Sequence, residues 1–197
     1  MSWSEYYKKF EGKSPRPLLL EVLKMFNFTP GLRAIDLGCG AGVETLHLLQ
    51  CQWDVVAVEK EIAGIETLQE GLSDSLRSKV SIIHSSFENL RELPQAHLVF
   101  AGLSIPFCRP ESLKPFWQVV EKSILPQGYF AGNFFGPDDD WVREKGLSGL
   151  SAEELREFFK DFEIIKWDEK NEMGPTALGP NKNWHVFTVV ARKRLSS

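Results

Sequence analysis

Cysteine is scarce in this sequence: there are three among 197 residues, and no two of them form a C-x-x-C pair. Unpaired cysteines without a paired motif fit a reducing compartment, so we expect a cytoplasmic protein without disulfides. A whole expected helix separates Cys39 from Cys51, and Cys108 is more distant still, so no metal site is predicted from them. Cys39 and Cys108 are each candidates for lining the ligand pocket.

Long apolar runs and an excess of basic charge are also missing. The longest apolar stretch, residues 98–108, is too short to span a bilayer, and the first ten residues lack the apolar core of a signal peptide. The formal net charge is −4, so no basic field attracts nucleic acid or an anionic membrane. We therefore expect a small-molecule substrate, with no nucleic acid and no membrane as partner. The 197 residues are enough for one domain with its own core.

The most informative stretch is residues 33–43, which read RAIDLGCGAGV. Its first half has the small and apolar side chains of a buried parallel strand. Three glycines, Gly38, Gly40 and Gly42, then alternate with small residues, which lets the backbone turn sharply and lie close to a ligand. A helix is expected to begin at Val43, with its free N–H groups pointing back at the turn. A strand, a glycine turn and a helix in this order predict a cradle for a nucleotide-type ligand.

The spacing of the glycines distinguishes between nucleotide ligands. The dinucleotide fingerprint is G-x-G-x-x-G, and here Val43 stands at the position of its third glycine. Asp36 ends the strand two residues before the first glycine, where its carboxylate would repel a pyrophosphate and attract an ammonium group. The pattern D-x-G-x-G-x-G resembles motif I of the class I S-adenosylmethionine (SAM) methyltransferases. The resemblance implies SAM as cofactor, S-adenosylhomocysteine (SAH) as product, and a cofactor site that includes Asp36, Gly38, Cys39, Gly40 and Gly42.

A second acidic residue supports an adenosine-containing ligand. Residues 53–58 are predicted to form the second buried strand, which leads into Glu59 and Lys60. An acid about 20 residues past the glycine turn is placed to accept hydrogen bonds from both ribose hydroxyls. After the third expected strand, many related enzymes carry an acid for the adenine amino group. This sequence has Ser86, which can hydrogen-bond the base, and Phe87, which can lie against its face.

The acceptor side of the site is expected after the fourth strand, residues 96–103. Ligands of open α/β sheets bind outside the carboxyl ends of the strands at the switch point, so the reacting methyl group should lie near Gly102–Phe107. Ser104 and Phe107 belong to a Ser-Ile-Pro-Phe segment. It partly resembles the acceptor motif of enzymes that methylate amino groups of nucleobases and glutamine, with one proline and the Asn or Asp missing.

A loop over residues 136–150 contains Asp140 and Trp141. Its length exceeds that of ordinary connections, which favours a lid or a substrate loop, whereas a solvated acidic loop is the alternative. Asp140 and Trp141 are therefore candidates for the acceptor side, with Trp141 placed to screen the transfer from water.

Residues 1–30 are predicted to form a helical cover ahead of the first strand rather than a separate domain. One short helix is expected over residues 3–10, and a second is expected to open at Ser14 followed by a first-turn proline. Tyr7 and Arg16 are the polar candidates of this cover, and a guanidinium there is able to pair with the methionyl carboxylate. Solvated surface is the alternative for both.

Five strand–helix units are followed by two strands, residues 162–167 and 184–192, joined by a segment without a helical pattern. A connection without a helix implies an antiparallel pair. The predicted fold class is therefore α/β: a Rossmann-like, seven-stranded, mostly parallel sheet over residues 31–197, with an antiparallel C-terminal hairpin and helices on both faces. This is the sheet of the class I methyltransferases, so the resemblance covers nearly the whole chain. The N-terminal cover, the Ser-x-Pro-Phe segment and Trp184–Phe187 are loosely similar to small bacterial enzymes of the tellurite-resistance and thiopurine type.

The resemblance implies an enzyme that transfers a methyl group from SAM to a small-molecule acceptor by in-line displacement. Such a transfer needs little covalent help from the protein, because the sulfonium is already a good leaving group and the enzyme mainly aligns the reactants and excludes water. The sequence accordingly shows no catalytic triad and no identifiable catalytic residue. Two other functions stay open: a non-catalytic SAM-binding or SAH-binding regulatory protein, and a nicotinamide oxidoreductase, which the misplaced third glycine disfavours. Neither the acceptor nor the oligomeric state follows from the sequence.

Overall fold

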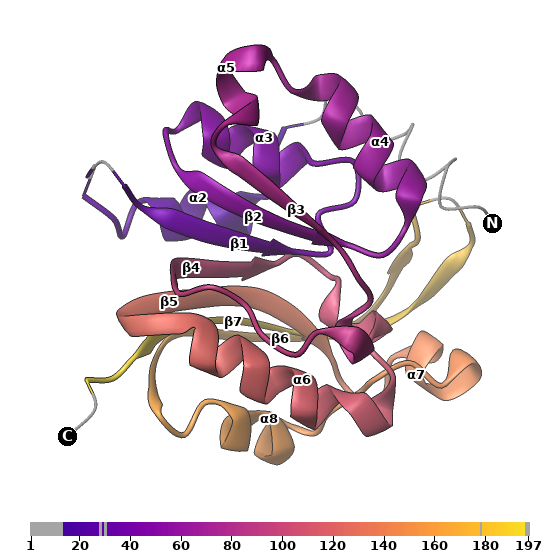
Figure 1. The fold of residues 1–197 in the computed structure, drawn as a ribbon. Coiled ribbons are helices and arrows are strands. Elements are labelled where there is room, and N and C mark those ends of the chain that lie inside the picture. Colours follow the sequence, from indigo (N-terminus) through magenta and orange to yellow (C-terminus); the bar gives the residue numbers. More distant parts are fainter. Residues whose placement is uncertain (1–13, 28, 30, 178, 196–197) are drawn as a thin grey trace.

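The structure is a computed structural model that describes residues 14–27, 29, 31–177 and 179–195. Its centre is one seven-stranded sheet with the strand order β3-β2-β1-β4-β5-β7-β6 (Figure 1). The strands are β1 (Arg33–Leu37), β2 (Asp54–Glu59), β3 (Val80–His84), β4 (Ala96–Ala101), β5 (Ile124–Phe135), β6 (Phe162–Pro175) and β7 (Asn181–Lys193).

The pairing of the strands confirms the predicted topology. β1 lies between β2 and β4, β2 pairs with β3 and β4 with β5, and all of these pairs are parallel. β7 runs antiparallel to both β5 and β6. The order of the strands reverses between β1 and β4, so a ligand is expected beyond the carboxyl ends of these two strands.

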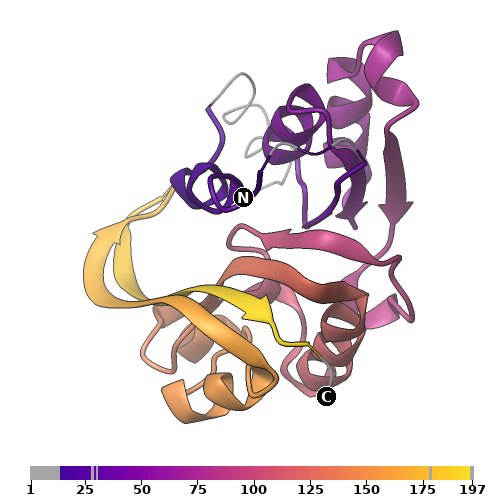
Figure 2. The ribbon, with the colours of Figure 1, turned by 90° about the vertical axis from the view of Figure 1, so that its left-hand side faces the viewer.

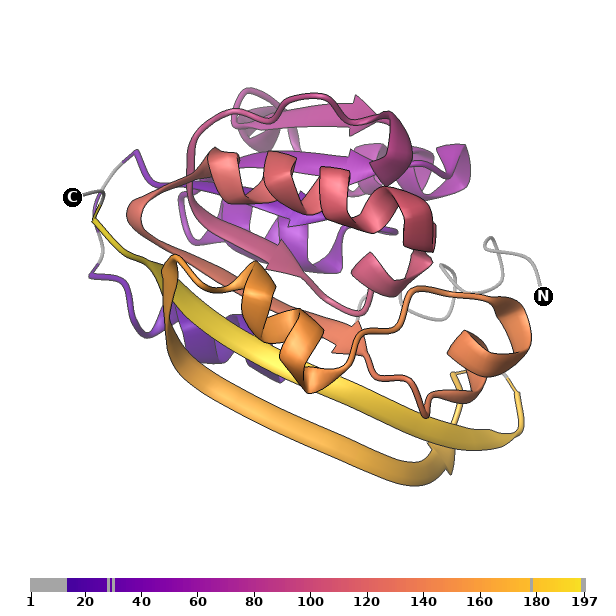
Figure 3. The same ribbon diagram turned by 90° about the horizontal axis from the view of Figure 1, so that it is seen from below.

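Helices cover both faces of this sheet. The described helices are α2 (Pro17–Leu23), α3 (Val43–Gln50), α4 (Ile62–Gly71), α5 (Asp74–Arg77), α6 (Pro110–Ser123), α7 (Asp140–Lys145) and α8 (Ala152–Phe158), with short 3-10 turns η1 (Phe87–Asn89) and η2 (Ile105–Phe107). Side chains of α2, α3 and α4 form one hydrophobic core with the sheet, and those of α6 and α8 form the other. Figure 3 shows α6 and α8 lying across the second face. None of the described helices is both long and apolar enough to cross a membrane.

Alternation along β1 shows why the strand divides the two cores. Ala34 belongs to the core under α3, whereas Ile35 and Leu37 belong to the core under α6. Because successive strand side chains point to opposite faces, Asp36 is directed to the side of α3. The strand thus delivers a carboxylate to the first turn of the following helix.

The N-terminal cover differs from the prediction in where its second helix starts. Arg16 is the N-cap residue and Pro17 occupies the first turn, so the expected start at Ser14 is wrong by two residues. The residue before a proline avoids the helical region, and this prevents the helix from beginning ahead of Pro17. The helix expected over residues 3–10 lies outside the described residues.

The last two strands are much longer than their predicted ranges, and α7 occupies part of the loop predicted over residues 136–150. Most of β6 beyond Trp167 is exposed and polar, so it lacks the apolar alternation from which strands are predicted. Its backbone pairing with β7 extends the strand instead. The hairpin also meets the N-terminal cover: Nζ of Lys166 donates to Oε2 of Glu21 at 2.7 Å, and Figure 2 shows α2 beside β6 and β7.

Candidate cofactor and acceptor site

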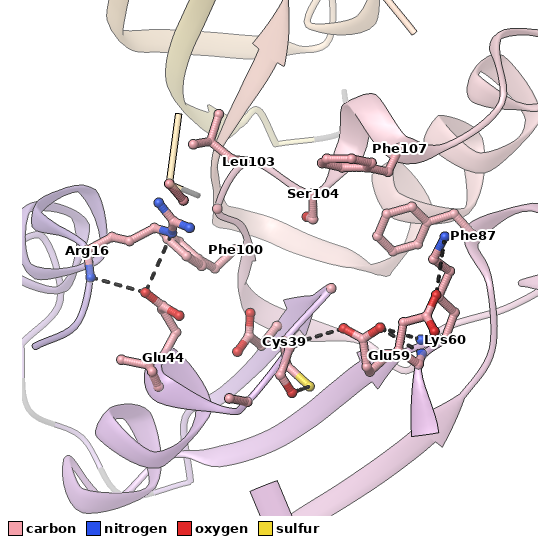
Figure 4. Close-up of a pocket in the computed structure, with 18 of the residues that line it drawn as sticks. Arg16, Cys39, Glu44, Glu59, Lys60, Phe87, Phe100, Leu103, Ser104 and Phe107 are labelled. Atoms are coloured by element: carbon pink, nitrogen blue, oxygen red, sulfur yellow. Dashed lines mark hydrogen bonds and ion pairs between the residues drawn. The ribbon is translucent and has the colours of Figure 1, made fainter. Parts of the chain in front are cut away.

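A cavity of about 640 Å³ opens beyond the carboxyl ends of β1, β2, β4 and β5. Its volume lies within the range of small-molecule sites. Figure 4 shows two facing sides: Cys39, Glu44 and Glu59 lie on one, and Leu103, Ser104 and Phe107 on the other. The predicted residues that line the cavity are Arg16, Asp36, Gly38, Cys39, Gly40, Glu59, Lys60, Ser86, Phe87, Gly102, Ser104, Phe107 and Trp141. Gly42 and Asp140 lie outside this lining, and Tyr7 falls among the residues that the structure does not describe.

The glycine turn packs closely against the segment that follows β4. Gly38 has a φ of +71°, and a Cβ on it would lie 2.5 Å from Cβ of Ser104. The N–H groups of Gly38 and Cys39 both donate to the carbonyl of Val58, at 2.8 and 3.0 Å. The N–H of Gly40 donates to Glu59, so these three donors are already engaged within the protein. The turn therefore supplies shape to a ligand rather than the anion-binding donors of a phosphate cradle.

Gly42 has a different role in the fold. Its φ is +83°, and a Cβ there would collide with Leu68 of α4. The missing side chain lets α3 pack closely against α4. This contact, rather than the cavity, accounts for the third glycine of the turn.

Asp36 lies at the centre of an acidic group. It is 2% exposed, and its Oδ2 accepts a hydrogen bond from Thr45 Oγ1 at 2.7 Å. Burial, followed by repulsion from Glu44, raises the pKa of Asp36 to about 7, while Arg16 opposes the shift weakly. Glu59 adds to the repulsion. The positive charge of a bound ammonium group would offset both the cost of burying these carboxylates and their mutual repulsion.

Glu59 is held rigidly at the end of β2. Its Oε2 accepts from the N–H of Gly40 at 2.8 Å, and its Oε1 accepts from the N–H groups of Lys60 and Glu61 at 2.8 and 2.9 Å. The side chain is only 6% exposed but lines the cavity. A carboxylate has about four acceptor positions and three are used here, so about one stays open, on Oε2, which the predicted ribose hydroxyls would share.

Arg16 closes the cavity from the N-terminal cover. Its backbone N–H donates to Oε1 of Glu44 at 3.1 Å, and its Nε lies 3.7 Å from the same oxygen. A Cβ on Gly102 would lie 2.7 Å from Cδ of Arg16, so the guanidinium stem crosses the end of β4. Glu44 was not among the predicted site residues. An acid in the first turn of the helix after the glycine turn is the signal that would have found it.

Phe87 and Ser86 lie where the adenine was expected. The ring of Phe87 stacks on Phe116, with centroids 4.5 Å apart and an interplanar angle of 18°, and it also lines the cavity. Packing against α6 fixes the orientation of this ring. Contact with adenine stays a prediction for both residues.

The hydroxyl of Ser104, which follows β4, binds the end of β1 and so is not directed at a methyl acceptor. Its Oγ donates to the carbonyl of Leu37 at 2.5 Å, and the residue is 8% exposed. Leu103 before it has a φ of +59°, a left-handed backbone that leucine rarely adopts. Such strain is concentrated at functional sites, and Leu103 lines the cavity on the side of Ser104 (Figure 4).

Four aromatic residues, Phe107, Phe135, Trp141 and Trp184, form what we call the aromatic wall of the cavity. The ring of Trp141 lies 5.3 Å from that of Trp184 and 6.2 Å from that of Phe107. Phe135 lies behind, 6.2 Å from Trp141 and 6.1 Å from Trp184. Trp184 was missed as a site residue, because nothing local shows that β7 returns to the cavity.

A buried ion pair supports the wall from behind. Nζ of Lys182 binds Oδ1 of Asp139 and lies over the rings of Trp184, Trp141 and Phe135 at 3.9, 4.8 and 5.0 Å. Asp139 is the N-cap of α7, where it accepts from the N–H of Trp141 at 2.9 Å. The pair thereby joins α7 to the hairpin.

The neighbouring Asp140 also joins α7 to β7. Its Oδ2 accepts from the N–H of Asn183 at 2.6 Å. The predicted acceptor-side role for Asp140 therefore has no support from its position, since its carboxylate holds the hairpin. Trp141, the other candidate of this loop, does line the cavity.

The thiols in and near the site are not activated. Burial, followed by repulsion from Asp36, raises the pKa of Cys39. Burial, followed by repulsion from Glu88, raises the pKa of Cys108 to about 12. Neither thiol is thus a thiolate nucleophile at neutral pH. Within the described part of the chain, no group of three His, Cys, Asp or Glu side chains is arranged to hold a metal ion.

Comparison with known proteins places this geometry in a family. A family model described as tellurite resistance protein TehB matches residues 4–177. No curated protein matches at a significant level. TehB from Haemophilus influenzae has a similar structure, with a TM-score of 0.74 at 18% identity over 98% of this chain and 68% of that chain.

Two other solved structures share the fold. A SAM-dependent methyltransferase from Methanosarcina mazei has a TM-score of 0.70 at 15% identity, over 93% of this chain and 100% of that chain. The 1,6-didemethyltoxoflavin-N1-methyltransferase of Burkholderia thailandensis, solved with 1,6-didemethyltoxoflavin and SAH, has a TM-score of 0.63 at 16% identity, over 91% of this chain and 78% of that chain. The resemblance predicted from the glycine turn and strand order is confirmed: this chain belongs to the TehB family and has the fold of these SAM-dependent methyltransferases.

Proposed function

We propose that the protein transfers the methyl group of SAM to a small-molecule acceptor by in-line displacement. The observation that carries this proposal is one cavity at the switch point with buried carboxylates on one side and aromatic rings on the other (Figure 4). SAM carries a cationic methionyl ammonium, which suits the acidic side. An acceptor on the aromatic side then faces the cofactor in a space from which water is largely excluded.

The cofactor side fits SAM in both shape and charge. In this proposal Asp36 binds the methionyl ammonium, with Glu44 adjacent, and Arg16 pairs with the methionyl carboxylate. Glu59 accepts hydrogen bonds from the ribose hydroxyls. Because Gly38 has no side chain, Ser104 packs directly against the turn that lines the cofactor side. When bound, SAM supplies a methyl group on a sulfonium, a good leaving group, so this chain's residues need only bind, orient and exclude water.

A non-catalytic SAM-binding regulatory protein is the alternative. A second, aromatic half of the cavity is what a transferase needs for its acceptor, whereas a sensor of SAM needs only the cofactor half. The Burkholderia thailandensis enzyme is a precedent for a small-molecule acceptor on this fold. The acidic net charge disfavours nucleic acid as the acceptor, and the three free cysteines fit a cytoplasmic location.

Two measurements test the proposal. Calorimetric titration should show binding of SAM and SAH and no binding of NADH. Incubation with methyl-labelled SAM and a panel of thiols, amines and oxyanions should then transfer label to at least one of these acceptors. Tight SAM binding with no transfer to any acceptor would favour the regulatory protein, and absence of SAM binding would contradict both functions.

Glu59→Gln tests the ribose contact. The native protein should bind 2′-deoxy and 3′-deoxy SAH more weakly than SAH, because each analogue loses one hydrogen bond to a carboxylate, worth about 1.5–3 kcal/mol or roughly 10- to 100-fold. The affinity of Glu59→Gln for SAH should fall by a similar factor. The difference in affinity between SAH and its deoxy analogues should largely disappear in this variant. Glu66→Gln, on the exposed side of α4, is the matched control. Persistent discrimination in Glu59→Gln would show that another group binds the ribose.

A further inference from the structure

Charge is divided unequally within the cavity. The cofactor side, here the lining residues up to Gly102, carries the carboxylates of Asp36, Glu44, Glu59, Glu61 and Glu88 together with the cations of Arg16 and Lys60. Among the described lining residues from Leu103 onward, Lys145 is the only charged one. The acceptor side therefore has no carboxylate in its described lining that could neutralise a cationic acceptor.

The rings of the aromatic wall keep surface for a ligand. Phe107, Trp141 and Trp184 are each partly exposed and line the cavity, whereas Phe135 is 1% exposed and forms their base. Lys182 and Asp139 fill the space behind, so the wall is supported away from the cavity. Rings held in this way offer apolar faces and edges to a flat partner at little entropic cost.

Aromatic rings also attract cations, but lysine ammonium groups already lie over the rings of this wall. The ammonium of Lys182 lies within 5.0 Å of three of its rings, and that of Lys145 lies 4.3 Å from the centroid of Trp141. A further cation would meet two ammonium groups, only one of which is neutralised by Asp139. The sulfonium of SAM would add to this repulsion.

We propose that the methyl acceptor is a planar aromatic small molecule without positive charge, bound with its ring against Trp141 and Trp184. This inference rests on the proposed function and names the acceptor class for the same site. Ring-to-ring contact favours a flat unsaturated acceptor over a saturated one of equal size. Lys145 and the bound cofactor favour a neutral or anionic acceptor over a cationic one.

The test measures binding of three size-matched probes to the full-length protein saturated with SAH. The probes are 2-naphthoate, 2-naphthylmethylammonium and decahydronaphthalene-2-carboxylate. Their binding is measured by calorimetry and by saturation-transfer NMR. We expect 2-naphthoate to bind with a Kd at least fivefold below that of either other probe. Trp184→Leu should weaken the binding of 2-naphthoate at least fivefold and change the affinity for SAH less than twofold. Trp167→Leu is the matched control, since Trp167 packs on Phe187 and Arg156 outside the cavity.

Each other outcome overturns a specific statement. Equal binding of the naphthyl ammonium would contradict the charge preference, and equal binding of the saturated carboxylate would contradict the preference for a planar ring. Unchanged 2-naphthoate binding in Trp184→Leu, or no binding of 2-naphthoate to the SAH complex, would remove the aromatic wall as its site. Failure of SAH itself to bind would instead contradict the proposed function.

Discussion

SAH binding is expected to strengthen up to tenfold per pH unit as the pH rises from about 5.5 to 7, and then to level off. Burial and the repulsion from Glu44 raise the pKa of Asp36 to about 7 in the free protein, so below this pH the carboxyl is largely protonated. The methionyl ammonium favours the ionised carboxylate and lowers that pKa in the complex. Binding therefore releases a proton below pH 7, and affinity rises with pH until the free protein is itself ionised.

Titration calorimetry at pH 5.5, 6.5 and 7.5, in two buffers of different ionisation enthalpy, measures affinity and proton release together. Asp36→Asn should remove both the proton release and the rise of SAH affinity with pH. It should also weaken SAH binding about 10- to 100-fold at pH 7.5, since a charged hydrogen bond contributes about 1.5–3 kcal/mol. Asp74→Asn on the exposed α5 is the matched control. Equal slopes in Asp36→Asn and the native protein would show that another group titrates.

The same carboxyl gives the free protein an opposite pH dependence of stability. Its folded pKa is raised above the ordinary value of 3.8, so the unfolded chain ionises first as the pH rises. The free native protein should lose stability relative to Asp36→Asn between about pH 4 and 7, where ionisation increasingly favours the unfolded state. Thermal unfolding of both proteins across this range, without SAH, measures the difference. A constant difference would contradict the raised pKa.

Lys182→Met is expected to lower the free energy of unfolding by about 3–5 kcal/mol, because it leaves the carboxylate of Asp139 buried without its cation. Asp139 is 0% exposed and Lys182 is 5% exposed, so water cannot replace the lost partner easily. The remaining contacts of Asp139, with the N–H groups of Trp141 and His185, stabilise its charge only in part. The loss should loosen α7 against β7 and therefore weaken acceptor binding more than SAH binding.

Urea unfolding of Lys182→Met and Lys170→Met makes the comparison. Lys170 lies on the same hairpin in an exposed pair with Glu172, where the loss should stay within about 1 kcal/mol. Lys182→Arg keeps the charge and should recover part of the stability. In a double-mutant cycle, Asp139→Leu should cost much less in the Lys182→Met background than in the native one. Equal losses in Lys182→Met and Lys170→Met would contradict a stabilising buried pair.

Local sequence determined the cofactor side of this protein. Asp36, Gly38 and Gly40 lie within one strand and one turn, and Glu59 lies at the end of the next strand, so their mutual placement follows from two neighbouring parallel strands. The alternation of apolar strands with amphipathic helices likewise predicted the sheet, because it depends on periodicities of two and 3.6 residues. Strand ends and loop interiors were the poorer predictions. β6 extends far beyond Trp167, since backbone pairing to β7, rather than its own polar side chains, continues the strand.

The acceptor side was decided by tertiary structure. Lys182 and Asp139, which support the aromatic wall, are separated by 43 residues, and no local pattern relates them. Trp184 becomes part of the cavity only because the C-terminal hairpin returns beside β5 and α7 covers its end. Asp140 is the converse case: the length of its loop suggested a lid, but the carboxylate of Asp140 accepts a hydrogen bond from the backbone of Asn183. A cofactor site built from adjacent strand ends is a local property of the chain, whereas a wall assembled from distant segments exists only once those segments have packed.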